Sequence, residues 1–175
     1  MSEQLVKQPG QSMHGIRAVF ARLRRSPLAM LGLAVVIALV LIAVFADYIA
    51  PYGYAAQDLM SAFEPPSANH WFGTDELGRD VLSRVLTGLQ ASMTVAVVSV
   101  ACAAVVGTAL GVMAGYRGGW LDTVVMRVVD VMFAFPVLLL AMAIVAVLGP
   151  GLATTIAAIS VVYVPIFARV ARAST

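Results

Sequence analysis

The sequence contains little charge and almost no cysteine. Only 11% of its 175 residues are charged, whereas 61% are hydrophobic, and the mean hydropathy is +0.94. Soluble domains carry about 25% charged residues, so this composition excludes an ordinary soluble globular domain. Cys102 is the single cysteine, which excludes a disulfide framework and a zinc site built on paired cysteines. The two histidines, His14 and His70, are too isolated to indicate a metal site.

Charge is absent above all from three long segments, residues 27–46, 85–116 and 131–168. About 20 apolar residues in a helix cross the hydrocarbon core of a bilayer, so the last segment is too long for one crossing. The helix-breaking stretch LGPGLA at 148–153 divides it in two. The sequence therefore predicts an all-α, polytopic membrane helix bundle with four transmembrane helices, at 27–49 and at about 91–114, 124–148 and 152–168.

The predicted spans divide the chain into four parts. Residues 1–25 form a basic tail, 27–49 the first transmembrane helix, 50–90 an external or interfacial segment, and 91–175 the start of a larger transmembrane domain. Five of the eleven basic residues precede the first helix, which predicts a cytoplasmic N-terminus. Residues 47–76 carry five acidic residues and no lysine or arginine, as an external loop does.

Small residues recur every four positions along the second predicted helix, which places them on one side of it. Such a ladder lets another helix backbone approach closely inside a membrane. The partner is either another helix of this chain or a second subunit, and the spacing alone does not distinguish the two. The ladder consists of Ser99, Ala103, Gly107, Gly111 and Gly115.

Two prolines and two charged residues lie in or beside the last two predicted helices. Pro136 and Pro165 each remove a backbone donor, so both are predicted to kink a helix. Arg127 and Asp130 are three residues apart and can pair along one helix face, but near the inner boundary their side chains are expected to reach toward water instead.

Charge is concentrated in FGTDELGRDVLSR, residues 72–84. Asp75, Glu76 and Asp80 could in principle supply an acid and a base, but no histidine-rich or nucleophilic serine motif accompanies them. Asp80 and Arg84 are four residues apart, which predicts a solvated ion pair on a short helix. We therefore expect no catalytic residues, no metal and no cofactor.

Three segments in order carry a family resemblance: HWFGTDELGRDVLSRVLTGLQASMTVAVV, AGYRGGWLDTVVMRVVDVMFAFPVLLLAMAIVAVLGPG and VYVPIFARVARAST. Together they resemble the C-type permease subunit of the dipeptide, oligopeptide and nickel ABC importers. One departure is Gln90, where the resemblance leads us to expect an arginine. The resemblance implies external or interfacial motif residues Gly73, Thr74, Asp75, Gly78, Arg79 and Asp80, and cytoplasmic-side motif residues Gly118, Gly119, Asp122, Arg127 and Asp130.

The resemblance also implies a function and a set of partners. The protein would form half of a pore in the bacterial cytoplasmic membrane, together with a second homologous permease subunit. An external solute-binding protein would deliver a peptide, and two cytoplasmic ATPase subunits would hydrolyse ATP, since the chain has no GxxxxGK[ST] phosphate loop. No nucleic-acid partner is expected. Members have six spans in a type I importer permease fold, with a Glu-Ala-Ala coupling loop after the fourth, so the chain is expected to be incomplete beyond Thr175.

Several alternatives remain at this stage. Importers for nickel chelates, opines and glutathione share these segments, so the resemblance does not select the solute. A membrane scaffold without transport activity would explain the helices and the small-residue ladder, but not the ordered motifs. An enzyme embedded in the membrane would need a polar catalytic set inside the spans, which the sequence does not contain.

Overall fold

The computed structural model describes residues 26–175, so the predicted cytoplasmic tail lies outside the described residues. Within this range the only strand-like feature is an isolated bridge between Thr74 and Asp80, and the predicted all-α class is confirmed. The elements in chain order are α2 (Pro27–Val44), α3 (Ala46–Ile49), the 3-10 turn η1 (Leu59–Ser61), α4 (Val81–Arg117), α5 (Gly119–Ala134), α6 (Val137–Leu148) and α7 (Leu152–Ala173).

Helix α4 is the long axis of the molecule. It contains 37 residues, and at about 1.5 Å per residue it is far longer than the roughly 30 Å of a hydrocarbon core. The predicted second span, at about residues 91–114, lies inside this helix. The helix begins ten residues before that span, at Val81, because the Asp80 carboxylate caps it by accepting a hydrogen bond of 2.8 Å from the Ser83 amide. Residues 81–90 therefore extend the helix before the predicted span.

The single helix predicted at 124–148 is wrong, because the chain forms two helices there. α5 and α6 meet at an angle of 95°. Pro136 disfavours helical geometry at the residue before it, and Phe135 is accordingly extended, with φ −87° and ψ 136°. Pro136 therefore breaks the helix rather than bending it. Pro165, by contrast, lies inside α7 without ending it and is almost fully buried.

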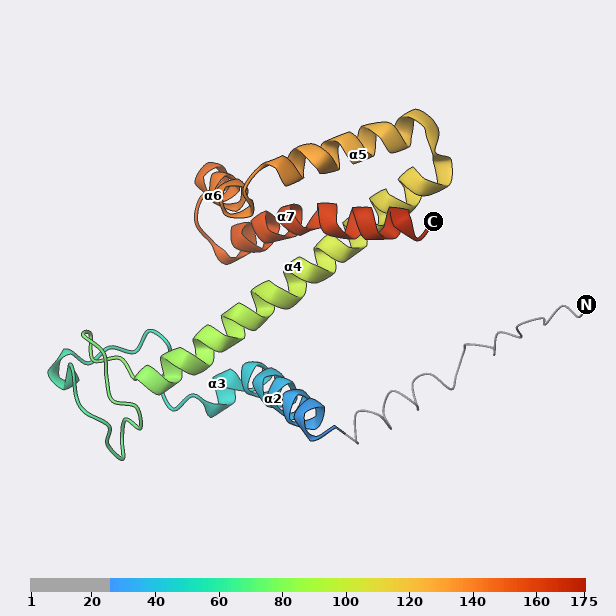
Figure 1. Cartoon of the computed structure of the whole chain (residues 1–175). Coiled ribbons are helices and arrows are strands. Elements are labelled where there is room, and N and C mark those ends of the chain that lie inside the picture. Colours follow the sequence, from blue (N-terminus) through green and yellow to red (C-terminus); the bar gives the residue numbers. More distant parts are fainter. Residues whose placement is uncertain (1–25) are drawn as a thin grey trace, which may run out of the picture.

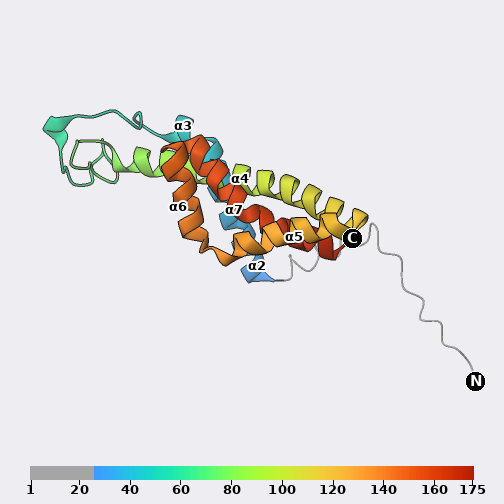
Figure 2. The same ribbon diagram turned by 90° about the horizontal axis from the view of Figure 1, so that it is seen from above.

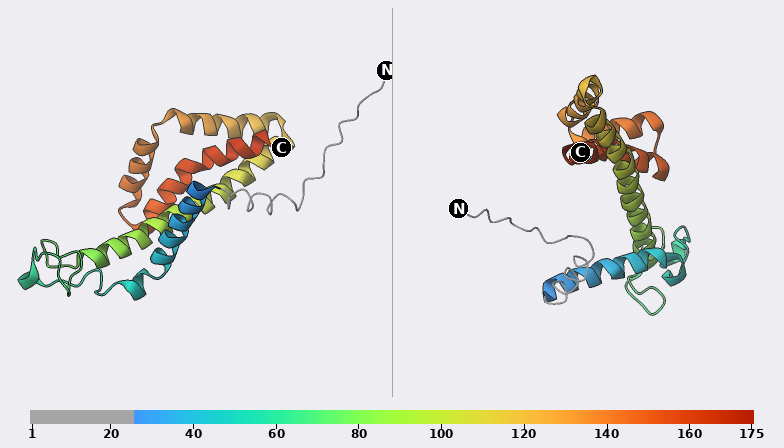
Figure 3. Two further views of the ribbon diagram at one scale, coloured as in Figure 1. Left: turned by 60° about the horizontal axis from the view of Figure 1, so that its bottom comes forward. Right: turned by 90° about the vertical axis from the view of Figure 1, so that its right-hand side faces the viewer.

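α7 packs along α4, and α5 runs beside α7, as Figures 1 and 2 show. α6 connects α5 to α7, lies at an angle to α5 and contacts α7. α2 contacts the other side of α4 and stands apart from α7 (Figure 3). Helices α2, α4 and α7 are long and apolar enough to cross a membrane, and α5 with α6 makes a fourth crossing only as a bent pair.

The turn between α4 and α5 depends on two consecutive glycines. Gly118 and Gly119 have φ values of 60° and 59°, in the left-handed region that other residues rarely adopt. The Gly118 amide also donates to the Ala114 carbonyl at 2.9 Å, which closes the end of α4. Because the chain reverses within this pair, α5 starts at the end of α4 and can run back beside α7.

Candidate functional site

The small-residue ladder of α4 lies against α7 of the same chain. Ser99, Ala103, Gly107 and Gly111 are all buried, and the Ser99 hydroxyl donates to the Ile156 carbonyl at 3.2 Å. A Cβ placed on Gly107 would lie 2.6 Å from the Val164 carbonyl oxygen, and one on Gly111 would overlap the Ala168 carbonyl. The two helix backbones are therefore in direct contact.

Small residues of α7 complete this contact, which we call the α4–α7 seam: Ser99, Ala103, Gly107 and Gly111 of α4 with Ala158 and Ala168 of α7. Both alanines are at most 1% exposed. Lipid tails are as apolar as leucine, so helices in a membrane gain little from burying apolar area and depend on close packing. The last member of the predicted ladder, Gly115, is half-buried beside Thr175.

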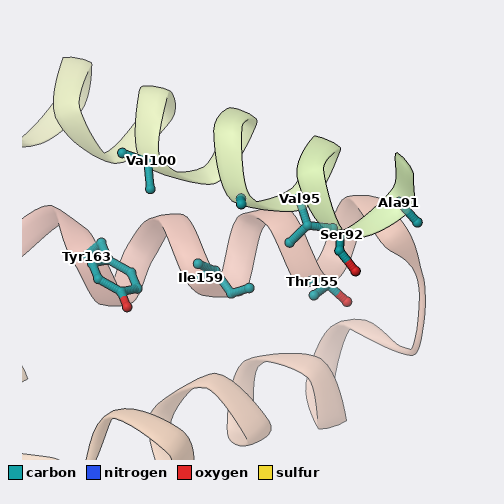
Figure 4. A pocket seen from close by; sticks show the side chains of 8 residues that line it. Ala91, Ser92, Val95, Val100, Thr155, Ile159 and Tyr163 are labelled. Atoms are coloured by element: carbon teal, nitrogen blue, oxygen red, sulfur yellow. The ribbon is translucent and has the colours of Figure 1, made fainter. Parts of the chain in front are cut away.

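A groove of about 570 Å³ opens between α4 and α7 beside this seam. Its lining residues are Ala91, Ser92, Val95, Ala96, Val100, Thr155, Ile159 and Tyr163. Figure 4 shows side chains from both helices along it, with the hydroxyl groups of Ser92, Thr155 and Tyr163 among apolar neighbours. Ligand sites in proteins are concave and mainly apolar with a few polar groups, and this lining has that character.

Two ion pairs join α5 to α7. Asp122 accepts two hydrogen bonds from the Arg172 guanidinium, at 2.5 and 2.6 Å, and Asp130 accepts one from Arg169 at 2.7 Å. Arg169 also lies over the Phe133 ring, 4.2 Å from its centroid. Of the two possibilities for Asp130, pairing with Arg127 along α5 is not the one observed, because Arg169 of the antiparallel neighbour α7 reaches Asp130 instead.

The charged stretch at 72–84 is organised around Asp75. Its carboxylate accepts hydrogen bonds from the amides of Leu77 (2.9 Å) and Arg79 (3.0 Å), from Arg79 Nε (2.8 Å) and from the Arg84 guanidinium. Partial burial acts to raise the pKa of Asp75, but these donors outweigh it and hold the pKa far below the usual range. An aspartate held ionised in this way organises the turn and is unsuited to general acid–base chemistry.

Asp80 fastens the same stretch to the first turn of α4. It is only 4% exposed and accepts hydrogen bonds from the Ser83 amide and hydroxyl and from His70 Nδ1 at 3.0 Å. Burial acts to raise the pKa of Asp80, but Ser83 and His70 lower it overall. The predicted solvated pair between Asp80 and Arg84 is wrong: Asp80 is a buried helix cap, and Arg84 bonds Asp75.

Tyr52, near the start of the loop before α4, contacts the residues around the Asp80 cap. Its amide donates to the Ser83 hydroxyl at 3.1 Å, and its ring stacks on His70 with centroids 4.8 Å apart. Sequence reasoning missed Tyr52, His70 and Ser83 as structural residues. The available signal was Ser83 three residues after Asp80, since a helix cap bonds the amide at that distance.

Thr74 and Gly78 hold the middle of the loop against the motif. Thr74 is buried, donates to the Ser61 carbonyl and accepts from the Glu64 amide at 2.8 Å. Gly78 has φ 66°, and a Cβ on it would overlap the Asp58 carbonyl, so no other residue fits. We call residues 50–80 the motif loop, because its shape is set by the motif residues from Gly73 to Asp80.

The geometry defines the class of protein first. Three described helices are long and apolar enough to cross a membrane, and two of them, α4 and α7, are in backbone contact through small residues. With a polar loop at one end of the longest helix, these are the features of a polytopic membrane protein.

Sequence comparison then identifies the family. Residues 16–66 match the N-terminal TM domain of oligopeptide transport permease C, and residues 107–175 match the binding-protein-dependent transport system inner membrane component. The chain belongs to the C-type permease components of ABC importers.

Curated relatives agree with this assignment. The chain is 44% identical over 156 residues to the dipeptide transport system permease protein DppC of Alkalihalophilus pseudofirmus, which covers 89% of this chain and 51% of the relative. It is 48% identical over 157 residues to the glutathione transport system permease protein GsiD of Escherichia coli, with 88% and 51% covered. The chain thus spans about half the length of these relatives.

Proposed function

We propose that the chain forms part of the membrane pore of an ATP-driven importer for short peptides or a peptide-like solute such as glutathione. The observation that carries the proposal is the identity of 44% and 48% with permeases for dipeptides and glutathione, spread over nearly nine-tenths of the chain. Both solutes contain peptide bonds and free carboxylates. The proposed solutes are therefore fewer than those of the family resemblance, which also included nickel chelates and opines.

The family assignment supports the proposed partners, and the distribution of basic residues supports the proposed orientation. The pore would be completed by a second permease subunit, ATP hydrolysis would take place in two cytoplasmic ATPase subunits, and an external binding protein would deliver the solute. The basic tail at 1–25 would lie in the cytoplasm and the motif loop outside, because lysine and arginine concentrate on the cytoplasmic side of membrane proteins. The chain itself would hydrolyse nothing.

The groove between α4 and α7 would line part of the solute pathway. Its volume of about 570 Å³ is in the range of small-ligand sites, and its hydroxyl groups can bond a peptide backbone as it passes. The α4–α7 seam beside the groove would keep the two helices aligned with each other, since their backbones meet there without intervening side chains.

Uptake of radiolabelled dipeptides and glutathione in the source bacterium tests this proposal. Deletion of the gene should abolish uptake of one of them, and the intact gene should restore it. Ala96→Trp fills the groove and should lower uptake strongly, whereas Val105→Trp, at a position of α4 that is 71% exposed and outside the groove, should not. Unchanged uptake after deletion would refute the proposed function, and equal effects of both tryptophans would refute the role of the groove.

A further inference from the structure

Phe63 has a backbone conformation that is unusual for its residue type. Its φ is 57°, and within residues 26–175 it is the only residue other than glycine with a positive φ. An aromatic residue is strained in this region, and such strain persists only where surrounding contacts impose it. Its side chain nevertheless remains 75% exposed, so burial of the ring within this chain does not explain the conformation.

The motif residues impose this conformation on Phe63. The Phe63 amide donates to the Asp75 carbonyl at 3.1 Å, and the Thr74 hydroxyl bonds the residues on both sides, Ser61 and Glu64. The Thr74 amide also donates to the Glu64 carbonyl at 3.1 Å. The turn is therefore held by four hydrogen bonds, and the aromatic side chain in it stays exposed.

Charge and helix length indicate that Phe63 lies outside the hydrocarbon core. Asp47 is the first charged residue after the uncharged helix α2, so it marks the membrane boundary, and it accepts a hydrogen bond from Gln90 of α4 at 3.3 Å. The nine residues of α4 before Gln90 extend about 14 Å past that boundary. The motif loop is attached at this far end, as Figure 1 shows, so burial of the ring in lipid tails does not explain it either.

The charge around Phe63 favours a partner of opposite sign. Residues 47–76 carry five carboxylates and no lysine or arginine, and the next two arginines, Arg79 and Arg84, both bind Asp75. Such a surface repels anionic lipid headgroups and attracts a protein surface rich in lysine and arginine. Two further exposed apolar side chains lie within four residues of Phe63, Leu59 at 69% and Met60 at 94%.

We propose that Phe63, with Leu59 and Met60, anchors a soluble protein partner that presents an apolar pocket bordered by lysine or arginine side chains. Aromatic anchors surrounded by complementary charge carry most of the binding energy in many protein interfaces. The external solute-binding protein is the first partner to examine. This identification of the partner rests on the proposed function, whereas the anchor itself does not.

Photocrosslinking in intact cells tests the anchor directly. With p-benzoylphenylalanine in place of Phe63 in the full protein, illumination should join the chain to one soluble protein, at a pocket bordered by basic residues. Affinity of that purified protein for the permease in nanodiscs should fall about tenfold or more with Phe63→Gly. Glycine accepts the positive φ, so the loop keeps its fold. Higher salt should slow association.

Two matched variants complete the experiment. Phe63→Tyr keeps the ring, and Tyr116→Ala removes an aromatic side chain that is 86% exposed at the opposite end of α4, so both should leave the affinity unchanged. Adducts only with lipid or with a second copy of the chain, no adduct, or an unchanged affinity of Phe63→Gly would overturn the proposal. A Phe63-dependent complex without peptide uptake would refute the proposed function and leave the anchor standing.

Discussion

The α4–α7 seam and the motif loop both depend on glycines that touch another backbone, but they do so in different surroundings. In the seam, Gly107 and Gly111 lie against carbonyls of α7, and one side-chain hydrogen bond, from the Ser99 hydroxyl to the Ile156 carbonyl, joins the two helices. In the motif loop, Gly78 lies against the Asp58 carbonyl, and the surrounding contacts are hydrogen bonds to Thr74, Asp75 and Asp80.

The difference reflects which interactions can still add stability in lipid and in water. Helices in lipid already have their backbone hydrogen bonds satisfied, so close packing of small residues is the main remaining source of stability. A loop in water has no regular ladder, so its amides and carbonyls need side-chain partners, and ionised aspartates are the strongest acceptors. Substitutions in the seam should therefore act through volume, and those in the loop through hydrogen bonds and backbone conformation.

The largest effect is expected for Gly111→Leu in the seam. The new side chain meets the backbone of Ala168, which cannot rotate away, so the helices must separate. Overpacking usually costs about 1–3 kcal/mol, and we expect the upper end here. Thermal unfolding in detergent measures the loss, and Val112→Leu, at an exposed position one residue later, is the control. Equal stability of the two variants would contradict the close contact between α4 and α7 in the seam.

A smaller and more local effect is expected for Gly78→Ala in the motif loop. Alanine is strained at φ 66°, and its Cβ overlaps the Asp58 carbonyl, so the loop should open at a cost of about 2 kcal/mol. Hydrogen exchange should increase across residues 58–80 and stay unchanged in α7. Gly53→Ala, where the added Cβ meets nothing within 4 Å, should have no such effect. Increased exchange in α7 as well would show that the two regions are coupled.

Thr74→Val should weaken the loop less than Gly78→Ala does. The shape of the side chain is kept, but the Ser61 carbonyl and the Glu64 amide lose a partner, which costs about 1–2 kcal/mol. The same exchange measurement should show faster exchange at residues 61–64, and Thr74→Ser should restore protection because it keeps the hydroxyl. Failure of serine to restore it would mean that the methyl group, rather than the hydroxyl, holds the turn.

The smallest effect is expected from mild acid. The pKa of Asp75 is lowered in the folded loop, so its contribution to stability is complete above the ordinary aspartate pKa of about 3.9 and is lost as the pH falls through the lower folded value. The stability difference between the wild type and Asp75→Asn should therefore be constant from pH 7 to 5 and shrink only below about pH 4. Trp71 fluorescence during thermal unfolding measures it, in a Trp120→Phe background. A difference that shrinks between pH 7 and 5 would contradict this account.

The sequence by itself determined the class of the protein and the small-residue face of α4. Membrane spans follow from the length of uncharged segments, and a residue type repeated every four positions lies on one side of a helix whatever its neighbour is. The sequence predicted a short helix at Asp80 and Arg84 and a separate span at about 91–114, whereas the structure joins the two in α4, because the helix that Asp80 caps continues to Arg117. The break after Phe135 was predicted only as a kink, since a proline disfavours helix but its neighbours decide how far the chain turns.

Only the tertiary structure decided which distant residues meet. A carboxylate among apolar residues requires a partner, but the identity of the partner depends on how the helices are aligned: Asp122 meets Arg172, fifty residues away, and Asp130 meets Arg169. The same holds for Phe63, whose left-handed conformation comes from Thr74 and Asp75 rather than from its own neighbours in the chain. Such contacts are set by the folded path of the backbone, and local residue preferences do not encode that path.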